Sequence, residues 1–118
     1  MATETGKVLV VAARQPDFAA LLQKDGFEVD LRTRPLEDAR ETEADVAVVF
    51  RGRLIGRSQA PALVERGIPV VEVLNMEPPS VSTAEWIRLS NRVAKADLAQ
   101  IVHAVAAWAR ARPRSVPA

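Results

Sequence analysis

The chain has 118 residues, a length typical of one domain with its own hydrophobic core. Its apolar fraction of 48% and its charged fraction of 26% are those of an ordinary soluble globular protein. A formal net charge of +1 gives no reason to expect nucleic acid or a membrane surface as the partner. Because the chain has no cysteine, disulfides, thiolate catalysis and cysteine metal sites are excluded.

No apolar stretch approaches the roughly 18 residues that are needed to cross a bilayer. Residues 1–6 are polar and acidic, unlike the basic and then apolar start of a signal peptide. We therefore expect a cytoplasmic protein without a membrane segment. His103 is the sole histidine and no acidic cluster has ligand spacing, so we expect neither a bound metal nor a cofactor.

Five short runs predict β-strands, at residues 7–11, 27–31, 46–50, 68–74 and 86–89. The continuous apolar run at 46–50 predicts a buried central strand. The runs at 27–31 and 86–89 alternate between apolar and polar residues, which predicts half-buried strands at the sheet edges.

Helix start and stop signals lie between these runs. Pro16 marks the start of a helix that Gly26 ends, and Ser58 can cap a second helix that Gly67 ends. Residues 35–42 are highly charged and predict at best a weak helix.

The last predicted helix has the clearest pattern. One face at the 3.6-residue period is apolar, which predicts that this face is buried. Its members are Leu98, Ile101, Val102, Val105 and Trp108. Trp108 is thus expected in the core, and His103, roughly opposite this face, is expected at the surface without a functional role.

Strands and helices alternate along the chain, with roughly five of each. This order predicts an α/β fold, a three-layer α/β/α sandwich around a five-stranded, mainly parallel sheet. We expect a disordered start at residues 1–6, one domain at 7–110, and a flexible basic tail or linker at 111–118.

The turn after the first strand lacks the glycine patterns of dinucleotide and triphosphate sites. The chain instead resembles the receiver domains of response regulators over residues 7–109. The run KVLVV at 7–11 resembles the opening strand of that family, and ADVAVV at 44–49 resembles the strand that carries the phosphorylated aspartate. GIPVV at 67–71 and the helix that follows ADL at 96–98 are similar to the fourth strand and the last helix. The resemblance implies the strand order 2-1-3-4-5.

The residues that carry receiver chemistry are absent from the matching positions. The family has an acidic pair that holds magnesium after the first strand, where this chain has Ala12 and Ala13. Phe50 stands at the position of the phosphorylated aspartate, Leu74 at that of the switch serine or threonine, and Asn91 at that of the lysine. Hydrocarbon side chains neither ligate magnesium nor accept a phosphoryl group. The resemblance thus implies a degenerate receiver, a pseudo-receiver that is not phosphorylated on aspartate.

Arginines follow the first and third strands, whose carboxyl ends flank the usual ligand crevice of such a sheet. They are Arg14, Arg51, Arg53 and Arg57. Converging guanidinium groups suit a phosphate, a carboxylate or an acidic patch on a partner. The alternative is that these arginines are solvated or pair with nearby acids, namely Asp17, Glu37 or Asp38.

Trp86 is expected to share one face of an edge strand with Arg88, opposite Ile87 and Leu89. Tryptophan is favoured at protein interfaces, so Trp86 and Arg88 form a candidate contact patch. The three arginines near the carboxyl end, Arg110, Arg112 and Arg114, lack interleaved aromatic residues, and we do not expect nucleic acid there.

The function predicted from these observations is a non-catalytic receiver-like module that binds a protein partner, or a second copy of itself, in a bacterial signalling or regulatory assembly. The alternative is a sensor that binds a small anionic ligand at the arginine-lined crevice. No nucleophile–base pair or metal cluster points to an enzyme.

Overall fold

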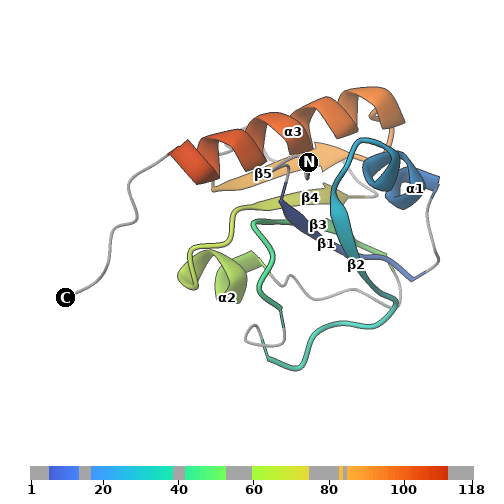
Figure 1. Cartoon of the computed structure of the whole chain (residues 1–118). Coiled ribbons are helices and arrows are strands. Elements are labelled where there is room, and N and C mark those ends of the chain that lie inside the picture. Colours follow the sequence, from blue (N-terminus) through green and yellow to red (C-terminus); the bar gives the residue numbers. More distant parts are fainter. Residues whose placement is uncertain are drawn as a thin grey trace.

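The computed structural model of the chain describes residues 6–13, 17–38, 42–52, 60–74, 83 and 85–111. Within these ranges the chain forms five strands and three helices (Figure 1). They follow one another as β1 (Lys7–Val11), α1 (Asp17–Lys24), β2 (Glu28–Arg32), β3 (Val46–Phe50), α2 (Ala60–Glu65), β4 (Val70–Leu74), β5 (Trp86–Ser90) and α3 (Lys95–Ala111).

All five strands belong to one sheet in the order β2-β1-β3-β4-β5, and every neighbouring pair is parallel. The predicted fold class and strand order are therefore confirmed. The three central strands are almost entirely buried, whereas every residue of the edge strand β5 is half-buried. This difference follows the sequence pattern, because only strands covered on both faces need to be continuously apolar.

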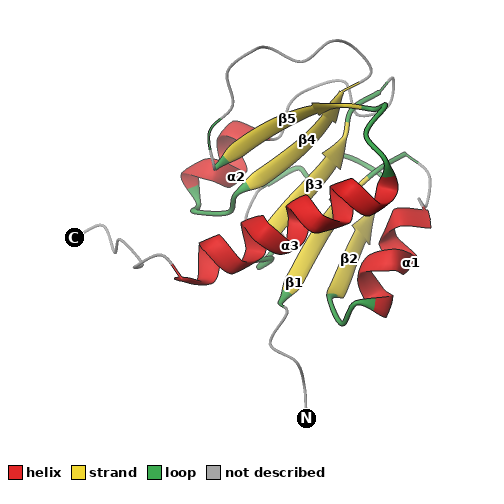
Figure 2. Ribbon diagram, turned by 90° about the horizontal axis from the view of Figure 1, so that it is seen from above, coloured by secondary structure: helices red, strands yellow, loops and turns green. Residues whose placement is uncertain are grey.

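Helices α1 and α3 cover one face of the sheet and α2 lies on the other (Figures 1 and 2). The core has two parts accordingly. Val10, Val48 and Val71 point toward α1 and α3, and they pack with Phe18 and Val102 of those helices. The strand residues that alternate with these point to the other face of the sheet, where they pack with α2. This second cluster includes Leu9, Val49, Leu63 and Val70.

Two helix ends decide where the next strands begin. Gly26, with φ at 100°, ends α1, and the amide of Phe27 then donates to the carbonyl of Leu22 at 3.0 Å. Since that amide is used by the helix end, β2 begins at Glu28, one residue later than the sequence suggested.

The same arrangement follows α2. Gly67 has φ at 82°, and the amide of Ile68 donates to the carbonyl of Leu63 at 3.0 Å. Pro69 has no amide to donate, so β4 begins at Val70 and not at residue 68 as predicted.

The sequence predicted roughly five helices, and the described part of the chain contains three. Residues 35–38 and 42–45, which lie between β2 and β3, are not helical. No helix of the described ranges has the length and apolarity to cross a membrane.

The expected burial of Trp108 was wrong, because 36% of the residue is exposed. The buried stripe of α3 consists instead of Leu98, Ala99, Val102, Val105 and Ala106. A helix of 17 residues is about 25 Å long, whereas a strand of five residues spans about 17 Å. The last turns of α3 therefore extend beyond the sheet (Figure 2), and Trp108 lies in that part.

Candidate functional site

The carboxyl ends of β1 and β3 lie side by side, because these two strands pair directly. The residue after β1 is Ala12, which is 4% exposed and whose amide donates to the carbonyl of Arg32 at 2.9 Å. The last residue of β3 is Phe50, whose ring packs edge-on against that of Phe18 in α1, with centroids 5.9 Å apart. The positions that the resemblance matched to an acidic pair and an acceptor aspartate therefore carry hydrocarbon side chains. Ala12 is buried, Phe50 packs partly buried against the core, and Ala13 is exposed.

Leu74 and Asn91, the other two positions that the resemblance matched to receiver residues, also lie at this edge of the sheet. Leu74 ends β4 and is 8% exposed, and its carbonyl accepts a hydrogen bond of 2.7 Å from the amide of Asn91. The topology thus brings together all the positions that the sequence resemblance singled out, at the carboxyl edge of neighbouring strands.

Asp17 is the nearest acid after β1 in the sequence. It starts α1, its side chain is 87% exposed, and its carboxylate lies 3.0 Å from Nζ of Lys95 in α3. Among the residues that the structure describes, no three His, Asp or Glu side chains are grouped so that they could hold a metal ion.

Of the four arginines proposed for an anion site, the described residues include Arg51 alone. Arg14, Arg53 and Arg57 lie outside them. Arg51 directly follows β3, and its Nη1 lies 3.2 Å from Oε2 of Glu72 on β4. Its partner is thus a carboxylate that the sequence analysis did not consider, and its side chain remains 25% exposed.

Glu72 is the principal residue that sequence reasoning missed. It stands in the middle of the central strand β4, and it is 1% exposed. Its second oxygen, Oε1, accepts a hydrogen bond of 2.9 Å from Nε1 of Trp86 on β5. A buried carboxylate is costly unless it is paired, and here a guanidinium and an indole compensate it. A single acid inside the run VVEVL was the available signal.

Trp86 and Arg88 lie on the α2 face of β5, whereas Ile87 and Leu89 pack against the core on the other face. The guanidinium carbon of Arg88 is 4.6 Å from the centroid of the Trp86 ring, which is a cation–π contact. Both residues are half-buried. Arg51, Glu72, Trp86 and Arg88 therefore form a connected polar group on three adjacent strands, which we call the Glu72 cluster.

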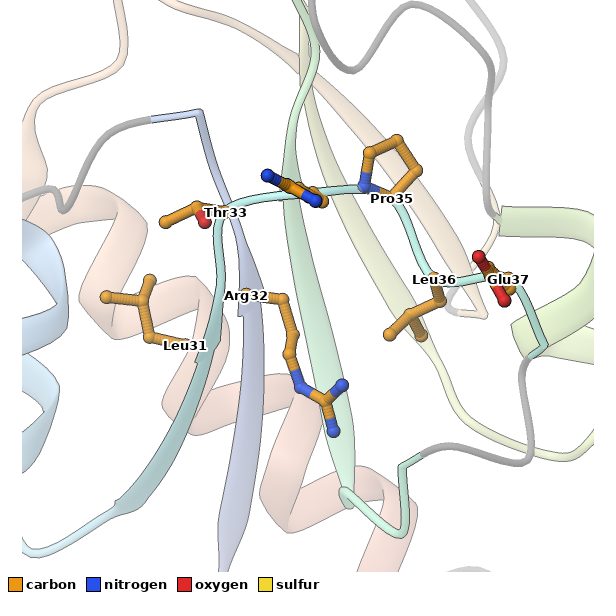
Figure 3. Close-up of a pocket in the computed structure, with 7 residues that line it drawn as sticks. Leu31, Arg32, Thr33, Pro35, Leu36 and Glu37 are labelled. Carbon is orange, nitrogen blue, oxygen red and sulfur yellow. The ribbon is translucent and has the colours of Figure 1, made fainter.

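A separate pocket of about 340 Å³ lies at the end of β2 and is lined by residues 31–37. Figure 3 shows the segment curving around it, with Arg32 and Leu36 directed toward its interior. Arg32 is paired with Asp30 on the same strand at 2.9 Å, and Glu37 adds a second carboxylate to the lining. The pocket is near the small end of the range for ligand sites, roughly 300–1,000 Å³, and its charges nearly balance, so we assign it no ligand.

His103 connects elements that are far apart in the sequence. Its Nε2 is 3.0 Å from a carboxylate oxygen of Asp25, and its ring lies 4.7 Å from that of Phe27. With a side chain that is 40% exposed, His103 joins α3 to the turn after α1.

Comparison with known proteins gives a likeness of fold. No protein-family model matches the chain, and the search of curated proteins found no match. The fold is similar to that of a response regulator receiver protein from Sinorhizobium medicae WSM419, with a TM-score of 0.70 and 14% identity over 87% of this chain and 95% of the other.

A second similar structure is the N-terminal domain of a response regulator/sensory box/GGDEF three-domain protein from Carboxydothermus hydrogenoformans. Its TM-score is 0.64 with 18% identity, over 89% of this chain and 97% of the other. A 3-dehydroquinate dehydratase-like protein from Bifidobacterium longum has a TM-score of 0.53 with 20% identity, over 86% of this chain and 96% of the other. The chain therefore has a receiver-like fold, and identities this low establish the fold alone.

Proposed function

We propose that this protein is a receiver-like interaction module that docks to a protein partner in a bacterial signalling or regulatory assembly and is not phosphorylated on aspartate. It acts in the cytoplasm and catalyses no reaction. The signalling role is carried over from the receiver proteins whose fold it shares. The partner is another protein or a second copy of this chain.

The observation that carries this proposal is the packing of Phe50 against Phe18 at the carboxyl end of β3. Phosphorylation of an aspartate requires a carboxylate at this point and magnesium held by oxygen ligands beside it. Phe50 supplies no acceptor, and Ala12 and Ala13 supply no ligand. Asp17 is directed toward Lys95. The residues present favour a constitutive role in binding over a phosphoryl switch.

The surface proposed for docking is the exposed part of Trp86 and Arg88 on the edge strand β5. Tryptophan and arginine are the side chains most often found at the energetic centre of interfaces. Trp86 is held in one orientation by its hydrogen bond to Glu72 and by the guanidinium of Arg88 on its ring. Such an anchored side chain loses little conformational entropy on binding, which favours its use as a contact residue.

Phosphorylation is tested by incubating the protein with acetyl phosphate and magnesium and measuring its intact mass. We expect an unchanged mass, and an unchanged melting temperature when beryllofluoride and magnesium are added. A genuine receiver domain treated in parallel provides the positive control. A stoichiometric phosphoryl adduct on any carboxylate would refute the proposal.

Docking is tested by affinity purification from a native bacterial lysate and by analytical ultracentrifugation of the purified protein. The variant Arg88→Glu should lose the partner that the wild type retains, or lose self-association. Arg92→Glu, an equal charge change in the exposed turn after β5, should retain it. If both variants bind as the wild type does, the partner does not dock on this surface.

A further inference from the structure

The sheet has two outer strands, β2 and β5, and their outer edges differ. At β5 the first residue, Trp86, exchanges two backbone hydrogen bonds of 3.2 Å with Thr83, so the start of that edge is already paired. At the other end of the sheet, β2 pairs with β1 alone and is the last strand on the α1 side (Figure 2). Its outer edge has no backbone pairing with any residue that the structure describes.

Alternate residues of β2 direct their backbone groups away from β1. At the two ends of the strand, the amide of Glu28 and the carbonyl of Arg32 both bond to the β1 side, at 3.1 and 2.9 Å. Every second residue of a parallel strand bonds to the same neighbour, so Asp30 also faces β1. Val29 and Leu31 therefore direct their N–H and C=O groups outward, where they form a template for a further strand.

The side chains of β2 divide between the two faces of the sheet in the same alternation. Val29 and Leu31 are half-buried against the core cluster beneath α1, so they keep some apolar surface open to solvent. The other face carries two acids and then a base, Glu28, Asp30 and Arg32, of which the last two pair with each other at 2.9 Å. A strand added to this edge therefore meets an apolar row on the α1 face and a charged row on the other face.

A second copy of the chain does not fit this edge. Antiparallel pairing of two β2 strands relates the copies by a half-turn about the normal of the sheet, which keeps both α1 helices on one face. Because each α1 packs on its own β2, the helix axes would be about 5 Å apart, the spacing of neighbouring strands, whereas packed helices need about 8–10 Å. Parallel pairing turns one copy over and places its charged row beside the apolar row of the other. The occupant that fits is an extended segment without a helix above it.

We infer that β2 accepts an extended segment of another protein as an antiparallel sixth strand of the sheet. Read from its amino end, this segment carries acid, apolar, base, apolar and base side chains, which lie opposite Arg32, Leu31, Asp30, Val29 and Glu28. Main-chain hydrogen bonds supply the affinity, and the charges fix the register, because opposite charges directly across an antiparallel pair attract each other. This surface lies at the opposite edge of the sheet from the docking surface proposed on β5, and it does not depend on that proposal.

Binding is tested with a synthetic peptide that has the central sequence Asp-Val-Lys-Val-Lys, blocked ends and a fluorescein label. The wild-type protein is added to the peptide, and fluorescence anisotropy measures binding, which we expect to be saturable. A control peptide has the same sequence with both valines N-methylated. It should bind about tenfold more weakly or less, because methylation removes the two N–H groups that face β2 and leaves every side chain unchanged.

Three protein variants locate the binding surface. Asp30→Lys should weaken binding of the peptide about fivefold, because attraction to the central lysine of the peptide becomes repulsion. Glu65→Lys, an equal charge change at the exposed end of α2, should bind the peptide as the wild type does. Arg88→Glu, which tests docking on β5, should also leave binding of the peptide unchanged.

Amide hydrogen exchange in the wild-type protein gives a test that needs no variant. In the free protein the amide of Asp30 should exchange slowly, and those of Val29 and Leu31 rapidly, because only the first is bonded to β1. A saturating concentration of the peptide should slow exchange at Val29 and Leu31 about tenfold or more. This alternation is specific to an added strand, since a ligand bound through side chains alone leaves the outward amides exposed.

Strand addition at β2 is refuted if the peptide does not bind, or if the N-methylated peptide binds equally well. It is also refuted if Asp30→Lys binds as the wild type does, or if exchange at Val29 and Leu31 is unchanged in the complex. Circular dichroism checks that each variant is folded, and Asp30→Asn, expected to bind about twofold more weakly, replaces Asp30→Lys should the latter not fold. Arg88-dependent partner binding together with failure of the peptide would reject the added strand and keep the docking module.

Discussion

The ring of Phe50, the last residue of β3, meets the ring of Phe18 in α1 edge-on, with centroids 5.9 Å apart and planes at 68°. This geometry is favourable for two aromatic rings and ties the end of a central strand to a helix across the core. The position that the resemblance matched to a phosphorylated aspartate is thereby used for packing. A substitution of Phe50 should therefore also change the stability of the protein.

Replacing Phe50 with aspartate should therefore not restore phosphorylation. The variant Phe50→Asp still lacks oxygen ligands at Ala12 and Ala13, so acetyl phosphate with magnesium should leave its mass unchanged. It should also lose about 2–3 kcal/mol in the free energy of unfolding, because a half-buried ring that packs against Phe18 is exchanged for a charge. Phe50→Leu, which keeps an apolar side chain, should lose about 1 kcal/mol in the same urea titration. A phosphoryl adduct on Asp at this position would contradict the expectation.

Arg51 and Glu72 should behave as a coupled pair in unfolding experiments. Removing one partner of a buried ion pair costs about 3–5 kcal/mol, and the partial exposure of Arg51 reduces this to about 2–3 kcal/mol. We expect losses of that size for Arg51→Gln and for Glu72→Gln, and a smaller loss for the double variant than the sum of the two. Additive losses in a double-mutant cycle would show that the two side chains do not interact.

Trp108 should contribute little to stability in spite of its size. We expect Trp108→Ala to change the free energy of unfolding by less than about 1 kcal/mol, because Trp108 is the large apolar side chain that is exposed among the described residues, at 36%. Phe18→Ala, at a residue that is 1% exposed, should cost about 3–5 kcal/mol. Comparable losses for the two variants would mean that Trp108 is part of the core after all.

Gly26 and Gly52 form a matched pair for testing backbone strain. Gly26 ends α1 with φ at 100°, a conformation that costs a residue with a side chain about 1 kcal/mol, so Gly26→Ala should destabilise by that amount. Gly52 does not have a positive φ, and a methyl group there meets no atom within 4 Å. Gly52→Ala should therefore leave the melting temperature unchanged or slightly raised. Equal effects at the two positions would rule out strain as the cause.

Sequence patterns predicted most of the fold because the burial of a strand in the sheet also determines which of its residues are apolar. The strands at 7–11 and 46–50 are apolar throughout apart from Lys7, since they are covered on both faces, and they were predicted with their correct bounds. The boundaries of β2 and β4 were shifted because the amides before them serve helix ends, a choice made by hydrogen bonds that hydrophobicity does not reveal.

Trp108 and Glu72 mark what the sequence alone left undecided. The helical period correctly predicted that α3 has a buried face, but the burial of Trp108 depends on how far the sheet extends beneath the helix. The role of Glu72 depends on Arg51 and Trp86, which lie 21 and 14 residues away along the chain. Local order follows from the chemistry of neighbouring residues, whereas side-chain pairing across strands follows from register, and only the tertiary structure determines register.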